Sequence, residues 1–125
     1  MGPSWSPHND YYSEIVFTSD RDGNYEIYTM NPDGLSPTNI SNNDSSDQSP
    51  SLSPDYSKIV FTSDRDGNDE IYTMNTDGTN VIKLTNTTEG ENTRPEWSPD
   101  GSKIVFQSNR DGNWEIYVME YSASK

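Results

Sequence analysis

A 19-residue segment occurs three times along this chain of 125 residues. Residues 13–31 and 57–75 differ at only two positions, and residues 102–120 differ from the second copy at five. The Ile-Val-Phe run inside each copy gives a period of 44 and then 45 residues. Self-similarity at a fixed period of this length is the sequence signature of a repeat architecture built from one supersecondary unit.

Each repeat predicts four short β-strands separated by tight turns. In the second repeat these strands are expected at 50–53, 59–63, 70–74 and 81–85, where β-branched and aromatic residues gather. The first strand of each repeat is predicted to begin at its proline. Asp-Gly pairs lie between the strands and supply the positive φ that hairpin turns require. The third repeat ends shortly after Met119, so its last sheet is expected to lack an outer strand.

The two central strands of each repeat are apolar on both faces. In Ile59-Val60-Phe61 one face carries Ile59 and Phe61, while Val60 points the other way. A sheet with one solvated face alternates apolar and polar residues, so these strands are expected to be buried on both sides. Small four-stranded sheets stacked radially on copies of themselves have this property, and a period of about 40–50 residues is typical of β-propellers.

The chain is therefore predicted to be an all-β, single propeller segment over 1–125. Its blades are expected at about 3–41, 49–85 and 94–121, the last without its outer strand. Leu, Ile, Val and Phe are scarce and the net charge is −13, a composition typical of disorder. The fixed spacing of the apolar runs favours a folded chain instead.

The motif Trp97-Ser-Pro-Asp-Gly-Ser-Lys-Ile-Val-Phe106, followed by Ser108-Asn-Arg-Asp-Gly-Asn113 and Glu115-Ile-Tyr117, resembles the TolB-like propeller repeat, also called the WD40-like or PD40 repeat. The resemblance covers nearly the whole chain. It implies four-stranded blades, a six-bladed ring as in TolB, and a protein-binding scaffold of the cell envelope. A periplasmic or extracytoplasmic location would follow, although no signal peptide opens the chain. Similar blades form the non-catalytic propeller of prolyl-oligopeptidase-like peptidases.

The chain departs from the repeat pattern at three places. The turn after Trp5 is three residues longer than the turn after Trp97. The second repeat has Leu52 in place of the tryptophan and Tyr56 in place of the turn glycine. The α/β domain of TolB has no counterpart among these residues, so the resemblance does not carry over the role of TolB in its own system.

Three blades are fewer than the roughly 4–8 that close known propellers. The first and last blades would each leave an apolar face open, and such a face normally marks an interface. Two chains give six blades, so we expect a homodimer that closes a ring around a two-fold axis. The competing interpretations are a fragment of a longer propeller, a larger ring, or a chain that folds only on assembly.

The hairpin between the second and third strands of each repeat has oxygen-bearing side chains around a glycine, as in the start of a calcium loop. The weak candidate ligands are Asp22, Asn24, Asp66, Asn68, Asp111 and Asn113. The EF-hand spacing does not hold here. The favoured interpretation is a tight turn in which Asp and Asn accept backbone N–H groups, and no cofactor is expected.

The same hairpins are expected to share one rim of the propeller with the loops between blades, at 41–49 and 86–94. Those loops differ from each other, as binding loops on a rigid scaffold do, although solvated linkers look the same. The candidate partner-contact residues on the rim are Arg21, Arg65, Arg110 and Trp114. Trp114 aligns with Tyr25 and Asp69, so its position is expected to be exposed, whereas Trp5 and Trp97 are expected to pack in the core.

The composition excludes several functions. Twenty-one acidic residues against eight basic ones argue against nucleic acid, and no apolar run is long enough to insert into a membrane. The single histidine, His8, has no placed partner for base catalysis, and no nucleophile elbow is present. We therefore expect no enzyme but a scaffold that assembles with itself and binds a protein or peptide. The alternatives are an engineered or recently duplicated half-propeller without a ligand, and an accessory propeller fragment of a prolyl-oligopeptidase-like peptidase.

Overall fold

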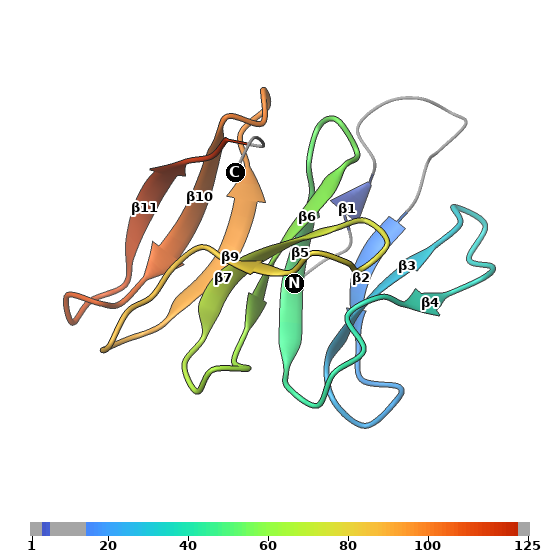
Figure 1. Ribbon diagram of the computed structural model, residues 1–125, viewed down its shortest axis with the longest axis horizontal. Helices are drawn as coiled ribbons and strands as arrows, with labels where there is room; N and C mark the ends of the chain where they lie inside the picture. Colours follow the sequence, from blue (N-terminus) through green and yellow to red (C-terminus); the bar gives the residue numbers. More distant parts are fainter. Residues whose placement is uncertain (1–3, 6–14, 123–125) are drawn as a thin grey trace.

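The computed structural model describes residues 4–5 and 15–122, and these residues form three antiparallel sheets that lie side by side (Figure 1). Blade 1 consists of β1 (Ser4–Trp5), β2 (Ile15–Ser19), β3 (Glu26–Met30) and β4 (Thr38–Asn39). Blade 2 consists of β5 (Asp47–Leu52), β6 (Lys58–Ser63), β7 (Glu70–Asn75) and β8 (Ile82–Lys83). Blade 3 consists of β9 (Asn92–Trp97), β10 (Lys103–Ser108) and β11 (Glu115–Glu120). The all-β fold and the three predicted blades are confirmed.

The strands follow one another in sequence order within each blade. The ladder of blade 2 pairs Val60 with Thr73, and the ladder of blade 3 pairs Val105 with Val118. The outer strands β4 and β8 are only two residues long, shorter than predicted. In the part of the chain that the structure describes, no fourth strand joins blade 3, as expected from the third repeat.

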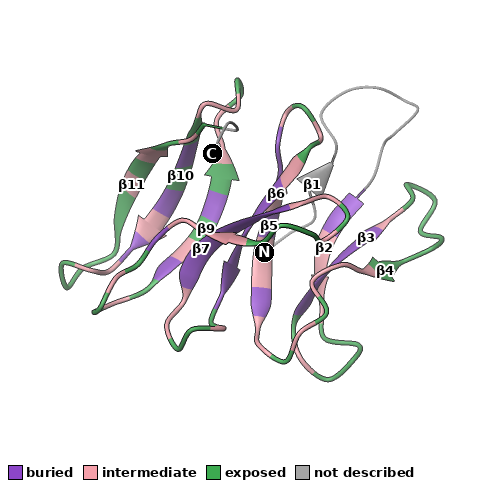
Figure 2. Ribbon diagram, viewed as in Figure 1, coloured by how far each residue is buried: buried purple, intermediate pink, exposed green. Residues whose placement is uncertain are grey.

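The core lies between the blades. Val16 and Ile27 of blade 1 pack against Ile59, Phe61 and other apolar residues of blade 2. A second cluster joins the opposite face of blade 2 to blade 3. Its buried members are Val60, Ile71, Ile104 and Phe106. The predicted burial of the central strands on both faces is therefore confirmed for blade 2, whose β6 and β7 are buried along most of their length (Figure 2).

Trp97 packs at the edge of the second cluster. Its ring makes an edge-to-face contact with Tyr121, with centroids 4.8 Å apart, and its indole N–H donates to the carbonyl of Ser51 at 2.9 Å. Trp97 thus joins blade 3 to the first strand of blade 2. The side chain of Trp5, His8 and the long turn at 6–14 lie outside the described residues.

The predicted starts of the first strands were wrong in blades 2 and 3, whereas Pro3 of the first repeat lies outside the described residues. Strands β5 and β9 begin at Asp47 and Asn92, three residues before the prolines that were expected to open them. Each strand contains a register shift around its proline, because a β-bulge accommodates a residue without an N–H donor. Parts of the expected loops 41–49 and 86–94 therefore belong to the inner strands of blades 2 and 3.

The turns follow the expected glycine chemistry with one exception. Gly67 has a φ of 105° in the hairpin of blade 2, as the Asp-Gly signal predicts. Tyr56 occupies the turn position that Gly101 holds in blade 3, and it keeps a left-handed φ of 68°. The packing of Tyr56 against the first core cluster compensates for this conformation. Among the residues that the structure describes, no helix is long and apolar enough to cross a membrane.

Candidate functional site

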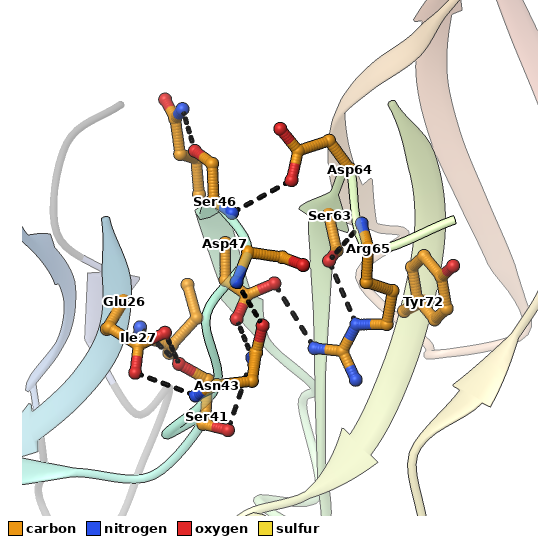
Figure 3. Close-up of polar contacts among 12 residues, drawn as sticks. Glu26, Ile27, Ser41, Asn43, Ser46, Asp47, Ser63, Asp64, Arg65 and Tyr72 are labelled. Atoms are coloured by element: carbon orange, nitrogen blue, oxygen red, sulfur yellow. Dashed lines mark hydrogen bonds and ion pairs between the residues drawn. The ribbon is translucent and has the colours of Figure 1, made fainter. Parts of the chain in front are cut away.

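The hairpins between the second and third strands lie against the loops between blades, and together they form one rim. In the middle of this rim, Ser46 N donates to Asp64 Oδ1 at 2.8 Å, and Asp64 N donates to the carbonyl of Ser46 at 3.3 Å (Figure 3). One repeat later, Glu91 N donates to Asn109 Oδ1 at 2.7 Å. The expected shared rim is therefore present in the structure.

The candidate calcium ligands brace the hairpins. Asp22, Asp66 and Asp111 each accept a hydrogen bond from the tyrosine hydroxyl six residues along the chain, at 2.7 Å for Asp66. The side-chain amides of Asn24 and Asn68 instead donate to backbone carbonyls of the following inter-blade loop. Asn113 lies exposed in the last hairpin. The aspartates and asparagines thus face different partners, and the described residues contain no acidic or histidine cluster that could hold a metal ion.

The tyrosine–aspartate pairs raise the pKa of each tyrosine, and in blade 2 the pKa of the aspartate is shifted as well. Burial and the hydrogen bond to Asp66 raise the pKa of Tyr72, because the deprotonated ring would lose a donor beside a carboxylate. The bond from the hydroxyl of Tyr72, together with the ammonium of Lys83, lowers the pKa of Asp66. The pKa values of Tyr28 and Tyr117 are raised chiefly by the bonds to their own aspartates. At neutral pH these tyrosines therefore stay protonated and keep their hydrogen bonds to the aspartates.

Each of the three candidate contact arginines lies over a pair of aromatic rings. The guanidinium carbon of Arg65 lies 5.0 Å from the ring centre of Tyr72 and 5.6 Å from that of Phe61. Arg110 lies 4.4 Å from the ring centre of Tyr117. Arg21 makes the corresponding contacts in blade 1 and is more exposed. Such cation–π stacking uses one side of the guanidinium and leaves its edge available for hydrogen bonds.

A buried carboxylate at the start of the third strand organises the rim. Glu26 accepts from Ser41 Oγ at 3.2 Å and from the backbone N of Asn43 at 2.9 Å (Figure 3). The side-chain amide of Asn43 in turn donates to Asp47, and Arg65 pairs with Asp47 at 3.2 Å. Asp47 is fully buried, so this chain of contacts connects blade 1 to the arginine of blade 2.

Blades 2 and 3 are joined by an equivalent network in which a single residue connects the glutamate to the arginine. Asn92 Nδ2 donates to Glu70 Oε1 at 2.6 Å, and Arg110 Nη2 donates to Asn92 Oδ1 at 2.9 Å. Sequence reasoning missed this network. The available signal was a glutamate that opens the third strand in every repeat, next to an apolar run predicted to be buried.

A polar cleft of about 280 Å³ opens between the inner strands of blades 2 and 3. Trp114 contributes an indole ring that is 51% exposed, as expected for its position. Arg94 contributes an exposed cation, and Asp69 and Glu91 contribute carboxylates. Burial, with the nearby charges of Glu91 and Asp64, raises the pKa of Asp69. The cleft therefore combines an aromatic surface with an excess of negative charge.

The outer face of blade 3 is open, as the exposed segments of β11 show in Figure 2, and it carries apolar side chains. Ile116 is 69% exposed, Val118 is 59% exposed and Val105 is 38% exposed. The equivalent residues of blade 2 are Val60, Ile71 and Thr73, which are almost wholly buried against blade 3. Blade 3 thus exposes the surface that is equivalent to the face of blade 2 buried against blade 3.

Comparison with known proteins agrees with this architecture. The family model described as the TolB beta propeller domain matches residues 1–89 and 66–125. A putative TolB from Agrobacterium tumefaciens superposes with a TM-score of 0.83 at 25% identity, over 96% of this chain and 46% of that chain. TolB from Acinetobacter baumannii superposes with a TM-score of 0.71 at 26% identity, over 100% of this chain and 30% of that chain. The chain therefore spans less than half the length of these relatives.

A puromycin-hydrolyzing peptidase from Mycobacterium tuberculosis shares the fold, with a TM-score of 0.72 at 14% identity, over 100% of this chain and 20% of that chain. None of the curated proteins matches this sequence. The two overlapping matches to the family model together extend over all 125 residues. With its three blades and their repeated motif, the chain belongs to the family of TolB β-propeller domains.

Proposed function

We propose that the chain is a non-catalytic propeller scaffold that pairs with a second copy into a six-bladed ring and binds a protein or peptide on its rim. The observation that carries the proposal is the open face of β11. Ile116 and Val118 are more than half exposed there. The same positions in blade 2 lie in the interface with the next blade, so the open face has the shape and polarity of a blade-to-blade contact.

Blade 1 supplies the complementary surface. Blade 2 receives Val16 and Ile27 of blade 1 on a face that carries Phe61 and Met74. The corresponding residues of blade 1 are Phe17 and Met30, both half-buried. Blade 3 of one copy would meet this face of the other, and a two-fold axis would make the contact twice. Each aliphatic side chain fully buried in this way contributes about 1.5–3 kcal/mol.

The polar cleft between blades 2 and 3 is the proposed ligand site. Its indole ring at Trp114 suits an apolar or cationic side chain, because aromatic faces attract both. The carboxylates of Asp69 and Glu91 favour a basic group beside it. A peptide segment with a basic side chain fits this chemistry. We further propose an extracytoplasmic location, on the grounds of family resemblance.

Solution mass tests the ring. We expect size-exclusion chromatography with light scattering to give twice the chain mass of 14.1 kDa across a dilution series. The variant Ile116→Glu should elute as a folded monomer, because a charge at an exposed position opposes dimerisation without disturbing the core. Val81→Glu is the matched control, since Val81 is 40% exposed on blade 2, which takes no part in the proposed contact. A folded wild-type monomer at every concentration would contradict the ring.

A further inference from the structure

The outer edge of β11 is unpaired within the described residues, whereas the corresponding edges of β3 and β7 each hold a short strand. The sequences at these edges are nearly the same. Glu26-Ile27-Tyr28, Glu70-Ile71-Tyr72 and Glu115-Ile116-Tyr117 open the three strands. The outer backbone edge of the third strand is therefore paired with a short strand in blades 1 and 2, and it is unpaired in blade 3 within the described residues.

Blade 2 shows how the edge binds its strand. Two residue pairs, Tyr72 with Lys83 and Thr73 with Ile82, form the ladder. Beyond the ladder, Leu84 N donates to the carbonyl of Ile71 at 2.8 Å. A short ladder of this length is weak by itself, so side-chain contacts have to complete it.

A threonine hydroxyl provides the first of those contacts. Thr85 Oγ1 accepts from Ile71 N at 2.9 Å and donates to Glu70 Oε1 at 2.7 Å. Two residues later, Thr87 N donates to Glu70 Oε2 at 2.8 Å. The hydroxyl of Thr85 thus takes the place of a backbone acceptor for Ile71 N beyond the end of the ladder. The carboxylate of Glu70 accepts hydrogen bonds from both Thr85 and Thr87.

Blade 1 uses the same contacts with different residues. Ile40 N donates to the carbonyl of Ile27, and Ile27 N donates to Ser41 Oγ, both at 2.9 Å. Asn43 N donates to Glu26 Oε2 at 2.9 Å. The common requirement is an apolar residue, then serine or threonine, then any residue, then asparagine or threonine.

Blade 3 has the corresponding residues on β11, but within the described residues no outer strand pairs with them. Glu115 is exposed and accepts no hydrogen bond from the described residues, whereas Glu26 and Glu70 are buried. By the register shared with β7, the N–H and C=O groups of Ile116 and Val118 point to the open edge. Extended peptides add to open sheet edges through such groups, and side-chain contacts supply the selectivity.

We propose that the outer edge of β11 binds an extended segment of a separate polypeptide with the pattern apolar–Ser/Thr–any–Asn/Thr. Residues 40–43 and 84–87 have this pattern and are already engaged in blades 1 and 2. The occupant pairs with Ile116 and Val118, and its hydroxyl and backbone N–H groups bind Glu115. The proposal does not rest on ring closure, because the edge of β11 is separate from the apolar face that a second copy would cover.

A peptide copied from residues 80–88 is the probe. We expect it to shift the amide resonances of Ile116 and Val118 when it is titrated into the isotope-labelled full chain. A peptide with valine in place of Thr85 keeps the shape and removes the hydroxyl. It should bind at least about tenfold more weakly, because it cannot donate the hydrogen bond to the charged carboxylate of Glu115.

Variants of the chain identify the receptor residue. Glu115→Ala should weaken binding of the wild-type peptide about tenfold, by the same measure of a charge-assisted hydrogen bond. Glu96→Ala removes an exposed carboxylate from β9 of the same blade and should leave binding unchanged. Three outcomes would overturn the proposal. They are no shift at β11 with millimolar peptide, shifts confined to β7, and equal affinity for the two peptides.

Discussion

Asn92 on β9 donates a hydrogen bond of 2.6 Å to the carboxylate of Glu70 on β7, and this bond joins blade 3 to blade 2. Both side chains are buried, at 0% and 1% exposure. Asn92 also accepts from Arg110, so a carboxylate, an amide and a guanidinium connect two blades at the rim. A buried charge is tolerated in such a place because every oxygen has a donor.

Removal of this carboxylate should destabilise the fold. Glu70→Ala removes the acceptor of the backbone N of Thr87 and leaves the amide of Asn92 with only the longer bond to Thr87 Oγ1, so we expect a loss of about 2–4 kcal/mol in the free energy of unfolding. Glu115→Ala removes the equivalent but exposed residue and should change it by less than about 0.5 kcal/mol. Urea unfolding at one protein concentration measures both. Equal effects would show that the network contributes little.

Arg65 and Arg21 allow a second comparison of two matched variants. Arg65→Lys loses stacking on Phe61 and Tyr72 and weakens the pairing with buried Asp47, so a cost of about 1–3 kcal/mol is expected. Arg21→Lys removes the equivalent contacts with Phe17 and Tyr28, and among the described residues no buried carboxylate pairs with Arg21. It should cost less than half as much in the same unfolding experiment. Comparable losses would mean that the rings, rather than Asp47, account for the role of Arg65.

The sequence predicted the blades because their determinants are local and repeated. Ile59, Val60 and Phe61 indicate burial on both faces without any knowledge of neighbours, and the Asp-Gly pair at 66–67 indicates a turn by its own backbone chemistry. Three copies of each signal made the period unmistakable. Blade number and strand order followed from these signals.

The polar rim could not be predicted in the same way, because its partners meet only after the blades stack. Arg65 was expected to be a surface contact, yet its ring partners and Asp47 come from three different strands. The starts of β5 and β9 were missed for a different reason. Pro50 and Pro95 resemble strand openings in sequence, whereas a bulge in three dimensions lets each strand continue through them.

A backbone prediction concerns the turn before the outer strands. Ser36 in blade 1 and Asn80 in blade 2 occupy the same repeat position, with φ of 58° and 56°. Asparagine tolerates this left-handed conformation better than serine. Ser36→Asn should therefore raise the free energy of unfolding by about 0.5–1 kcal/mol, and Asn80→Ser should lower it by a similar amount. Chemical unfolding of the two variants checks this, and shifts of the same sign would contradict it.

Three turn aspartates have lowered pKa values. Hydrogen bonds from Ser102 lower the pKa of Asp100 to about 2, and bonds from Ser57 and Thr79 lower the pKa values of Asp55 and Asp77. A carboxyl with a lowered pKa stabilises the fold above its ordinary pKa and loses that contribution as pH falls through the lowered value. These turns should therefore persist below pH 3.8.

Asp69 should show the opposite pH dependence. Burial and the charges of Glu91 and Asp64 raise its pKa, so the folded chain binds this proton more tightly than the unfolded chain does. Charged Asp69 therefore destabilises the fold at neutral pH, and the penalty disappears as pH falls through the raised pKa to below 3.8. We expect Asp69→Asn to raise Tm at pH 7 and to have little effect at pH 3. Asp44→Asn, at an exposed loop position, should change Tm at neither pH. A gain for Asp69→Asn that persists at pH 3 would assign the effect to packing of the amide rather than to charge.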